Sequence, residues 1–362
     1  MMHHKAGITR RDAMKLGAGA AAALAAGPLG AETAAATAAT ARMPDSEWSR
    51  IRGFNYQPSY GSSGIELWQR FDAKVIAEEL AQGKRLFPKM NALRWWQSWD
   101  SFLRDPKRYA RDFETTLQLA DQVGCKVMPC LFNRWHDATL DYGGIYIDHF
   151  LPKASWVQKD KMFDAYLSEL VGGHKDDPRV LAWDLCNEPY AYSCPRESIP
   201  EIVKAETAWL KSLHDFCKES GAKAPITVGI PGTSPETVEP ISDVLSIHPY
   251  WCHNNPGAKK ENFEKSLDHA VAVALKTGKP LVASECCWGA LDDAVRVESI
   301  RYTLTQLRAR NIGWTVYLLH HSLIADAHRP EFGPLSGPGN LAFIEADGTL
   351  RPGHGVFNDF AE

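Results

Sequence analysis

The sequence predicts a single-domain (β/α)8 TIM barrel of the α/β class. Short apolar runs alternate with amphipathic helical patterns after residue 42, giving eight expected strands, and no linker, internal repeat or change of composition interrupts them. The roughly 320 residues that remain after the N-terminal segment suit one barrel with elaborated loops. No Gly-x-Gly-x-x-Gly or phosphate-binding loop follows the first apolar run, which argues against a dinucleotide-binding, doubly wound sheet.

The N-terminal segment, residues 1–41, is predicted to be a twin-arginine signal peptide and spacer, and residues 42–362 to be the barrel domain. A basic start and the pair Arg10-Arg11 precede a Gly/Ala stretch that is too short and too poor in large apolar residues to anchor the chain in a bilayer. We therefore expect the twin-arginine export machinery as a partner, a periplasmic or secreted location, and no membrane association after signal removal. A disordered basic tail is the alternative.

Charge and cysteine content argue against two further classes of protein. A formal net charge of −4 disfavours nucleic acid or an anionic membrane as a partner. Eight cysteines in 362 residues are too sparse for a disulfide framework. Because the twin-arginine route exports proteins folded in a reducing compartment, we expect some thiols to stay free. No pattern in the sequence indicates an oligomeric state.

Three apolar runs define the first half of the predicted barrel. The runs 51–56, 90–95 and 125–131 have the length of strands. Amphipathic patterns predict the helices that follow them, with a long loop before the last one, at 66–85, 109–123 and 157–171.

The second half repeats the same alternation. A run of six mostly apolar residues that begins at Val180 is typical of a strand buried on both faces. The turn signal Gly278-Lys279-Pro280 precedes the seventh strand. The remaining strands and the helices between them are expected at 226–229, 244–248, 280–285 and 312–318, and at 200–220, 261–277 and 293–310.

The fourth strand ends on Asn187-Glu188-Pro189. Proline has no N–H for the strand ladder and biases the residue before it away from helix, so the strand must end here. Glu188 is thereby placed at the carboxyl end of a core strand, where barrel enzymes carry catalytic residues. For Glu188 alone, a solvated charge in an ordinary turn is the alternative interpretation.

The seventh strand also ends on a single carboxylate, Glu285. Two strands that each deliver one glutamate to the same end of a barrel meet the requirement of a two-carboxylate hydrolase. One carboxyl must be protonated and give its proton to the leaving oxygen, and the other must be ionised and attack the sugar carbon. A charge at the edge of a loop is the alternative for Glu285 alone, but the pair is more specific than either residue.

With these two glutamates the chain resembles the retaining glycoside hydrolases of clan A, most nearly glycoside hydrolase family 5, the cellulase and mannanase family. The likeness covers the barrel at the level of strand order. The residues that carry it are Asn187-Glu188-Pro189, Glu285, Arg94 ending the second strand, and His248-Pro249-Tyr250 ending the sixth.

The resemblance implies a metal-independent retaining β-glycosidase that cleaves O-glycosidic bonds of a carbohydrate substrate by double displacement, without a cofactor. It implies Glu188 as the acid/base, Glu285 as the nucleophile, and Asn187 as a hydrogen-bond partner of the sugar 2-hydroxyl. It further implies that Arg94 and Tyr250 hold the nucleophile.

The resemblance also implies that His248 lines the catalytic subsite. Physical chemistry supports these roles separately, since a guanidinium near Glu285 favours the ionised carboxylate. Each residue has a structural alternative: Arg94 in a structural ion pair, His248 as a satisfied core histidine, and Tyr250 as a packing residue.

Two positions depart from the family pattern. The family usually has a histidine at the end of the third strand, whereas residues 131–136 here leave Asn133 or His136 to take its place. The family usually ends the eighth strand with a tryptophan under the scissile sugar, and by offset that position falls at Tyr317. We therefore count Asn133, His136 and Tyr317 among the expected substrate-binding residues.

Tryptophans are frequent at the predicted strand ends. Sugars present C–H faces that pack well on aromatic rings, so a rim of tryptophan beside two glutamates suits a carbohydrate cleft. We expect Trp95 and Trp288 to bind substrate, although core packing is the alternative for any one of the group: Trp95, Trp96, Trp99, Trp135, Trp251 and Trp288.

Two other functions compete with a glycosidase. Cysteines and histidines also gather near strand ends and would suit a Cys/His metal-dependent hydrolase, but their spacing matches no standard zinc pattern, and we predict no metal. A non-catalytic carbohydrate-binding barrel would need the tryptophans but not the two glutamates. The residues considered for the metal site are Cys130, Cys186, Cys252, Cys286, Cys287, His253, His320 and His321.

Overall fold

The computed structural model describes residues 41–135, 143–151, 161–190, 199–252, 259–324, 326 and 340–361. Eight parallel strands form a closed barrel in chain order, and the last strand pairs with the first. The predicted TIM barrel is therefore confirmed. The strands are β1 (Arg52–Asn55), β2 (Ala92–Trp96), β3 (Lys126–Cys130), β4 (Trp183–Asn187), β5 (Ile226–Pro231), β6 (Leu245–His248), β7 (Leu281–Ala283) and β8 (Gly313–Val316).

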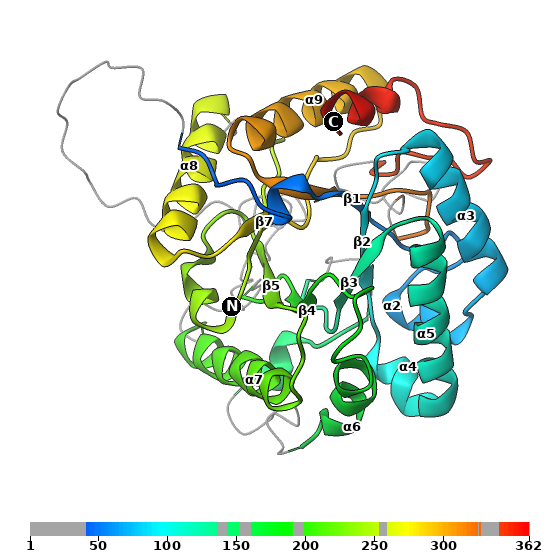
Figure 1. The fold of residues 1–362 in the computed structure, drawn as a ribbon, viewed down its shortest axis with the longest axis vertical. Coiled ribbons are helices and arrows are strands. Elements are labelled where there is room, and N and C mark those ends of the chain that lie inside the picture. The colour runs from blue at the N-terminus through cyan, green and yellow to red at the C-terminus, as the bar shows by residue number, and fades with distance from the viewer. Residues whose placement is uncertain are drawn as a thin grey trace, which may run out of the picture.

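Helices surround this barrel on the outside (Figure 1). None of the described helices is long and apolar enough to cross a membrane. The α-helices are α2 (Gly64–Gln69), α3 (Ala73–Leu86), α4 (Trp99–Arg104), α5 (Pro106–Gln122), α6 (Asp164–Leu167), α7 (Ile199–Glu219), α8 (Lys260–Thr277) and α9 (Asp293–Ala309). Short 3₁₀ or π segments are η1 (Trp48–Arg50), η2 (Ile147–Phe150), η3 (Ser168–Gly172), η5 (Pro235–Thr237), η6 (Glu239–Ile241) and η8 (His354–Phe360).

The helix expected at 66–85 is wrong in one respect, because the chain forms two helices there, α2 and α3. The Asp72 side chain accepts hydrogen bonds from the backbone N–H groups of Lys74 and Val75 and so caps a new helix start. The apolar periodicity continues across residues 70–72, so the break was invisible to a pattern that counts only apolar positions.

The next helix, α5, begins earlier than the predicted residue 109. Asp105 accepts a hydrogen bond from the backbone N–H of Arg108, and Pro106 occupies the first helical position, where its missing N–H has no intrahelical acceptor to lose. The short helix α4 was not predicted. For the helix expected at 157–171, residues 157–160 lie outside the described ranges, and the described helical part is α6 followed by the π-helical η3.

Apolar side chains close the barrel interior at the amino ends of the strands, here called the lower end. Polar side chains fill it at the carboxyl ends, here called the upper end. On β2, Ala92 and Arg94 face inward, since alternate residues of a strand share a face. The apolar cluster inside the lower barrel consists of Trp48, Ile51, Ala92, Met128, Leu181, Ala182, Val244 and Val282. The buried polar layer that includes Asn55, Arg94, Asp184, Ser246, His248, Ser284 and Thr315 forms the floor of the candidate site.

Candidate active site

The end of β4 is irregular, and this irregularity shapes the site. Its register against β5 shifts between Asp184 and Asn187. Residues three apart on a regular strand face opposite sides, yet both Asp184 and Asn187 bind Arg94 inside the barrel. The following residue, Glu188, has a φ of 47°, in the left-handed region that side chains other than glycine rarely adopt. The backbone here takes an unusual course that brings the side chains of Asp184, Asn187 and Glu188 into one site.

Arg94 is the central cation of the site. Its side chain is fully buried, and its N–H groups donate to Asp184 Oδ2 (2.8 Å), Glu285 Oε1 (2.6 Å), Asn55 Oδ1 (3.0 Å) and Asn187 Oδ1 (2.9 Å). Burial alone would lower the pKa of Arg94, but the negative charges around it, including Asp184 and Glu285, hold this pKa well above its usual value. The guanidinium therefore stays charged and holds the Glu285 carboxylate in one orientation.

Arg94 lies in the middle of β2, which continues to Trp96, and does not end the strand as the sequence suggested. Its contact with Glu285 is nevertheless the expected one. The hydroxyl of Tyr250 donates a second hydrogen bond to Glu285, to Oε2 at a distance of 2.8 Å. Arg94 and Tyr250 thus bind the two oxygens of the same carboxylate.

His248 connects the two glutamates. Its Nδ1 lies 2.8 Å from Glu188 Oε1 and 3.6 Å from Glu285 Oε2. One side-chain atom from each of these three residues lies within 4.8 Å of the other two. The structure therefore brings Glu188 and Glu285, from opposite parts of the sequence, to one buried location.

The environments of the two carboxyl groups differ. Burial raises the pKa of Glu188 to about 7, an effect that the Arg94 charge only partly offsets. Glu285 instead forms a direct ion pair with Arg94. Burial lowers the pKa of His248 to about 4, so the imidazole is neutral near pH 7. Two carboxyl groups with opposed environments are the arrangement in which one serves as an acid and the other as a charged group.

Asn187 and Asn133 form a second polar pair beside the glutamates. The Asn187 side-chain amide donates to Asn133 Oδ1 at a distance of 2.9 Å. The Asn133 amide in turn donates to the carbonyls of Trp135 and Gly143. Asn187 Nδ2 carries two N–H groups, and the second has no acceptor among the described residues, so it is available to a ligand. The other candidate for this position, His136, lies outside the described residues.

The expected aromatic residues divide into two groups. Trp288 is partly exposed and packs edge-on against Tyr250, with ring centroids 5.4 Å apart. Tyr317 is 8% exposed, and its hydroxyl donates a long hydrogen bond to Gln57 Oε1 (3.4 Å). Both residues pack against Tyr250, which binds Glu285, and so they lie on the Glu285 side of the barrel mouth.

Trp95 is a correction to the expected substrate-binding set. Its side chain is 1% exposed and packs in the core against Tyr56 and Trp68. It points away from the barrel interior because Arg94, the preceding residue of β2, points inward. Trp95 therefore supports the barrel wall and is removed from the candidates for sugar contact.

Several residues of this site were missed by sequence reasoning. Asp184 pairs with Arg94, Asn55 binds both Arg94 and the Ser284 carbonyl, and Ser284 binds His248. Gly229 is needed for close packing, since a Cβ there would lie 2.8 Å from His248 Nε2. Asp184 lies three residues before Asn187, a spacing that regular strand geometry would have assigned to the other face.

Cysteine takes no part in any group suited to a metal ion within the described ranges. The two groups of histidine and carboxylate side chains close enough to share an ion contain no cysteine. Seven cysteines are present as free thiols in the described part of the chain. His253, another residue considered for the metal site, lies outside the described residues.

A parallel (β/α)8 barrel with two apposed glutamates at the carboxyl ends of β4 and β7 is an arrangement typical of glycoside hydrolases. The family profile for cellulase, glycosyl hydrolase family 5, matches residues 61–322. The chain belongs to glycosyl hydrolase family 5, as the sequence resemblance predicted.

Individual relatives agree with this assignment. Mannan endo-1,4-beta-mannosidase F from Aspergillus clavatus is 31% identical over 103 residues, 27% of this chain and 23% of the relative. Mannan endo-1,4-beta-mannosidase A from Emericella nidulans is 25% identical over 231 residues, 59% of this chain and 57% of the relative. The matches thus span about a quarter to somewhat over half of these curated relatives.

Solved structures share the fold at low sequence identity. An exo-beta-1,4-mannosidase from Opitutaceae bacterium strain TAV5 superposes with a TM-score of 0.67 at 18% identity, covering 85% of this chain and 58% of that one. The endo-beta-1,4-mannanase from Thermotoga petrophila superposes with a TM-score of 0.58 at 16% identity, covering 86% and 76%. These likenesses establish the barrel architecture.

Proposed function

We propose that the protein is a retaining β-glycosidase in which Glu188 is the acid/base and Glu285 the nucleophile. The observation that carries this proposal is the apposition of the two carboxyl groups, with an oxygen of each within 4.8 Å of the other. Retaining enzymes keep their carboxyl groups about 5–5.5 Å apart, whereas inverting enzymes need about 6.5–9.5 Å to admit a water molecule. The short separation favours the retaining mechanism, which is also the one typical of the family.

In the first step, protonated Glu188 gives its proton to the glycosidic oxygen while Glu285 attacks the anomeric carbon. The bond to the leaving group breaks, and a covalent glycosyl–enzyme ester forms on Glu285. The raised pKa of Glu188, about 7, keeps the required proton available near neutral pH. Arg94 and Tyr250 hold Glu285 from both oxygens, so the nucleophile is oriented before substrate arrives.

In the second step, Glu188 acts as a base. It takes a proton from a water molecule, whose oxygen attacks the anomeric carbon and breaks the ester to Glu285. Two inversions at the same carbon give net retention. The free N–H of Asn187 is available to bind the sugar 2-hydroxyl, where hydrogen bonds strengthen in the transition state.

We propose a β-1,4-linked mannoside, in a polysaccharide or its oligosaccharides, as the substrate. The support comes from relatives and structural neighbours whose names specify mannan endo-1,4-beta-mannosidase or exo-beta-1,4-mannosidase. Trp288, partly exposed beside Tyr250, offers an aromatic face to a sugar ring at this site.

We also propose that the barrel, residues 42–362, acts after export. The support is the twin-arginine pattern around Arg10-Arg11, which lies outside the described residues. A reporter fused behind residues 1–41 should reach the periplasm or medium, and Arg10→Lys with Arg11→Lys should retain it in the cytoplasm.

The substrate assignment is tested with purified protein on β-mannan, cellulose and matched aryl β-mannoside and β-glucoside. We expect new reducing ends from β-mannan and preferential cleavage of the mannoside, with both activities lost in Glu285→Gln. Cleavage of cellulose and the glucoside alone would overturn the mannoside assignment. A first-formed product with the inverted anomeric configuration, observed by NMR, would overturn the retaining mechanism.

A further inference from the structure

A chain of buried hydroxyl groups leads from the barrel wall to the acid/base. Glu188 Oε1 lies 2.8 Å from His248 Nδ1, and His248 Nε2 lies 3.0 Å from the Ser284 hydroxyl. That hydroxyl lies 2.5 Å from the hydroxyl of Ser246 on the adjacent strand β6. Ser246 and Ser284 are 0% exposed and His248 is 1% exposed, so bulk water does not compete for these contacts.

The direction of the hydrogen bonds follows from counting donors. A neutral imidazole has one N–H and one acceptor nitrogen. If Nδ1 carries the proton, Ser246 donates to Ser284, Ser284 donates to Nε2, and Nδ1 donates to Glu188. Every O–H and N–H in the chain then has an acceptor.

The reverse direction leaves a buried donor without an acceptor. If Nε2 carried the proton, it would donate to Ser284, and Ser284 would donate to Ser246. In the part of the chain that the structure describes, the Ser246 hydroxyl has no other hydrogen-bond acceptor than Ser284. A buried hydroxyl without an acceptor is unfavourable, whereas an unused acceptor on a hydroxyl oxygen costs less.

We propose that Ser246 and Ser284 are positioning residues: Ser284 donates to Nε2 and holds the His248 ring, so that Nδ1–H donates to Oε1 of Glu188 and leaves Oε2 to carry the catalytic proton. This inference rests on the proposed acid/base role of Glu188. It assigns a part in the reaction to two serines whose hydroxyl groups bond to each other and to His248, not to the reacting carboxyl groups.

The surroundings of His248 keep the ring neutral. The charges of Glu285 and Asp184 favour an imidazolium, and that of Arg94 disfavours it. Tyr250 also faces the pair through its bond to Glu285. Burial is the largest of these influences and keeps the imidazole neutral, as donation in a single direction requires.

The proposed tautomer has a consequence for each step of catalysis. Donation from Nδ1–H stabilises the Glu188 carboxylate that appears after the proton leaves. Without the Ser284 hydroxyl, Nε2 loses its hydrogen-bond donor, and the ring is no longer held in the position from which Nδ1–H donates to Oε1 of Glu188. A ring that is not held in place no longer confines the catalytic proton of Glu188 to Oε2.

The tautomer can be measured without any substrate. In the full chain labelled with ¹⁵N-histidine, the His248 signals are identified by their absence from His248→Gln. We expect the shifts of a protonated Nδ1 and an unprotonated Nε2 in the wild type. Ser284→Ala should keep the proton on Nδ1, since a buried Nε2–H would have no acceptor, but should move the Nε2 shift to that of a nitrogen without a hydrogen bond. A wild-type His248 protonated on Nε2 would overturn the proposal.

The kinetic test compares leaving groups. Proton donation matters for a poor leaving group and hardly at all for dinitrophenolate. We expect Ser284→Ala to lower glycosylation about tenfold with an unactivated mannoside and less than twofold with the dinitrophenyl glycoside. Ser246→Ala should act in the same direction and decides the matter if Ser284→Ala does not fold.

The matched control is Thr227→Val, which removes another 0% exposed barrel hydroxyl, one whose single hydrogen bond to a described residue goes to the Val244 carbonyl. We expect no dependence on the leaving group in this variant. Equal losses for both substrates in Ser284→Ala, or the same selective loss in Thr227→Val, would overturn the proposal. Full activity of Glu188→Gln would instead overturn the acid/base assignment, while the NMR result would still decide the tautomer.

Discussion

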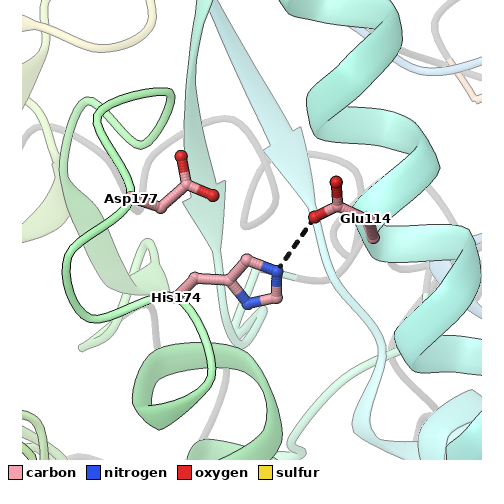
Figure 2. A group of neighbouring side chains, drawn as sticks. All are labelled: Glu114, His174 and Asp177. Carbon is pink, nitrogen blue, oxygen red and sulfur yellow. Dashed lines mark hydrogen bonds and ion pairs between the residues drawn. The ribbon is translucent and has the colours of Figure 1, made fainter.

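Two clusters of this molecule contain the same side-chain types: two carboxylates, a histidine and an arginine. The mouth cluster, at the carboxyl ends of the strands, consists of Glu188, Glu285, His248 and Arg94. The lower cluster lies between α5 and the segment that leads into β4, and Figure 2 shows its carboxylates and histidine directed toward one another. It consists of Glu114, Asp177, His174 and Arg179.

The two arginines are used differently. In the lower cluster Arg179 pairs with both carboxylates, with contacts of 2.8 Å to Glu114 and 2.6 Å to Asp177. Hydrogen bonds from Arg179 lower the pKa of each carboxyl group. Arg94, by contrast, forms ion pairs with Glu285 and Asp184.

Glu188 forms no ion pair with an arginine among the described residues, and burial raises its pKa to about 7. The same set of residues therefore gives a symmetric structural ion cluster at one end of the barrel and an acid beside a charged nucleophile at the other. The comparison teaches that asymmetry of environment distinguishes a catalytic pair of carboxylates from a structural one.

The largest expected effect separates the clusters by activity. Glu285→Gln should lower kcat about 10⁵-fold, because no covalent intermediate can form. Glu114→Gln should leave kcat within about twofold and lower the free energy of unfolding by about 1 kcal/mol or less, since Glu114 is 38% exposed. Steady-state kinetics and thermal unfolding of both variants check this. A large loss of kcat in Glu114→Gln would break the comparison.

The next effect tests the geometry of the arginines. Arg94→Lys should lower kcat about 100-fold, because one ammonium group cannot reproduce the separate hydrogen bonds to Glu285, Asp184 and Asn187. Arg179→Lys is the matched control and should leave kcat unchanged. Wild-type turnover in Arg94→Lys at an unchanged pH optimum would show that Arg94 does not hold the nucleophile.

The smallest effect concerns pH, where the clusters should respond at opposite ends of the scale. The first step needs protonated Glu188, so kcat/KM should fall as the pH rises above about 7. In the lower cluster the carboxyl pKa values are lowered on folding. Their contribution to stability is therefore complete above the ordinary values, 4.5 for Glu114 and 3.8 for Asp177, and is lost as the pH falls through the lowered ones.

A pH–rate profile and melting temperatures between pH 2 and 6 separate these two responses. Arg179→Ala should reduce the acid-dependent loss of stability and leave the alkaline limb of activity in place. An alkaline limb that moves in Arg179→Ala would mean that the lower cluster influences the acid/base.

The fold could be predicted from the sequence because its signals are local. Each strand is a short apolar run, and the fourth and seventh stop at a carboxylate that the barrel must carry at its mouth. The break between α2 and α3 escaped prediction, since the capping role of Asp72 competes with an uninterrupted apolar period.

The site could be predicted only in part. Glu188, Glu285, Arg94 and Tyr250 follow from strand ends and a family pattern, but the role of Asp184 depends on a register shift that only the pairing of β4 with β5 produces. The sequence did contain a signal against Trp95 as a sugar contact. An inward Arg94 requires its neighbour on the strand to face outward.

The central claim is that Glu188 is the acid/base and Glu285 the nucleophile, and azide rescue tests it most directly. With an activated aryl glycoside, Glu188→Ala should still form the glycosyl–enzyme, because the leaving group hardly needs a proton, and should then stall without a base. Azide needs no deprotonation and should restore turnover. In Glu285→Ala the first step is lost, and azide can attack only from the face that Glu285 occupied.

The anomeric configuration of the glycosyl azide, read by NMR, gives the answer. We predict a β-azide, with the substrate's configuration retained, from Glu188→Ala and an inverted α-azide from Glu285→Ala. An inverted product from Glu188→Ala together with a retained product from Glu285→Ala would contradict the account and exchange the two roles.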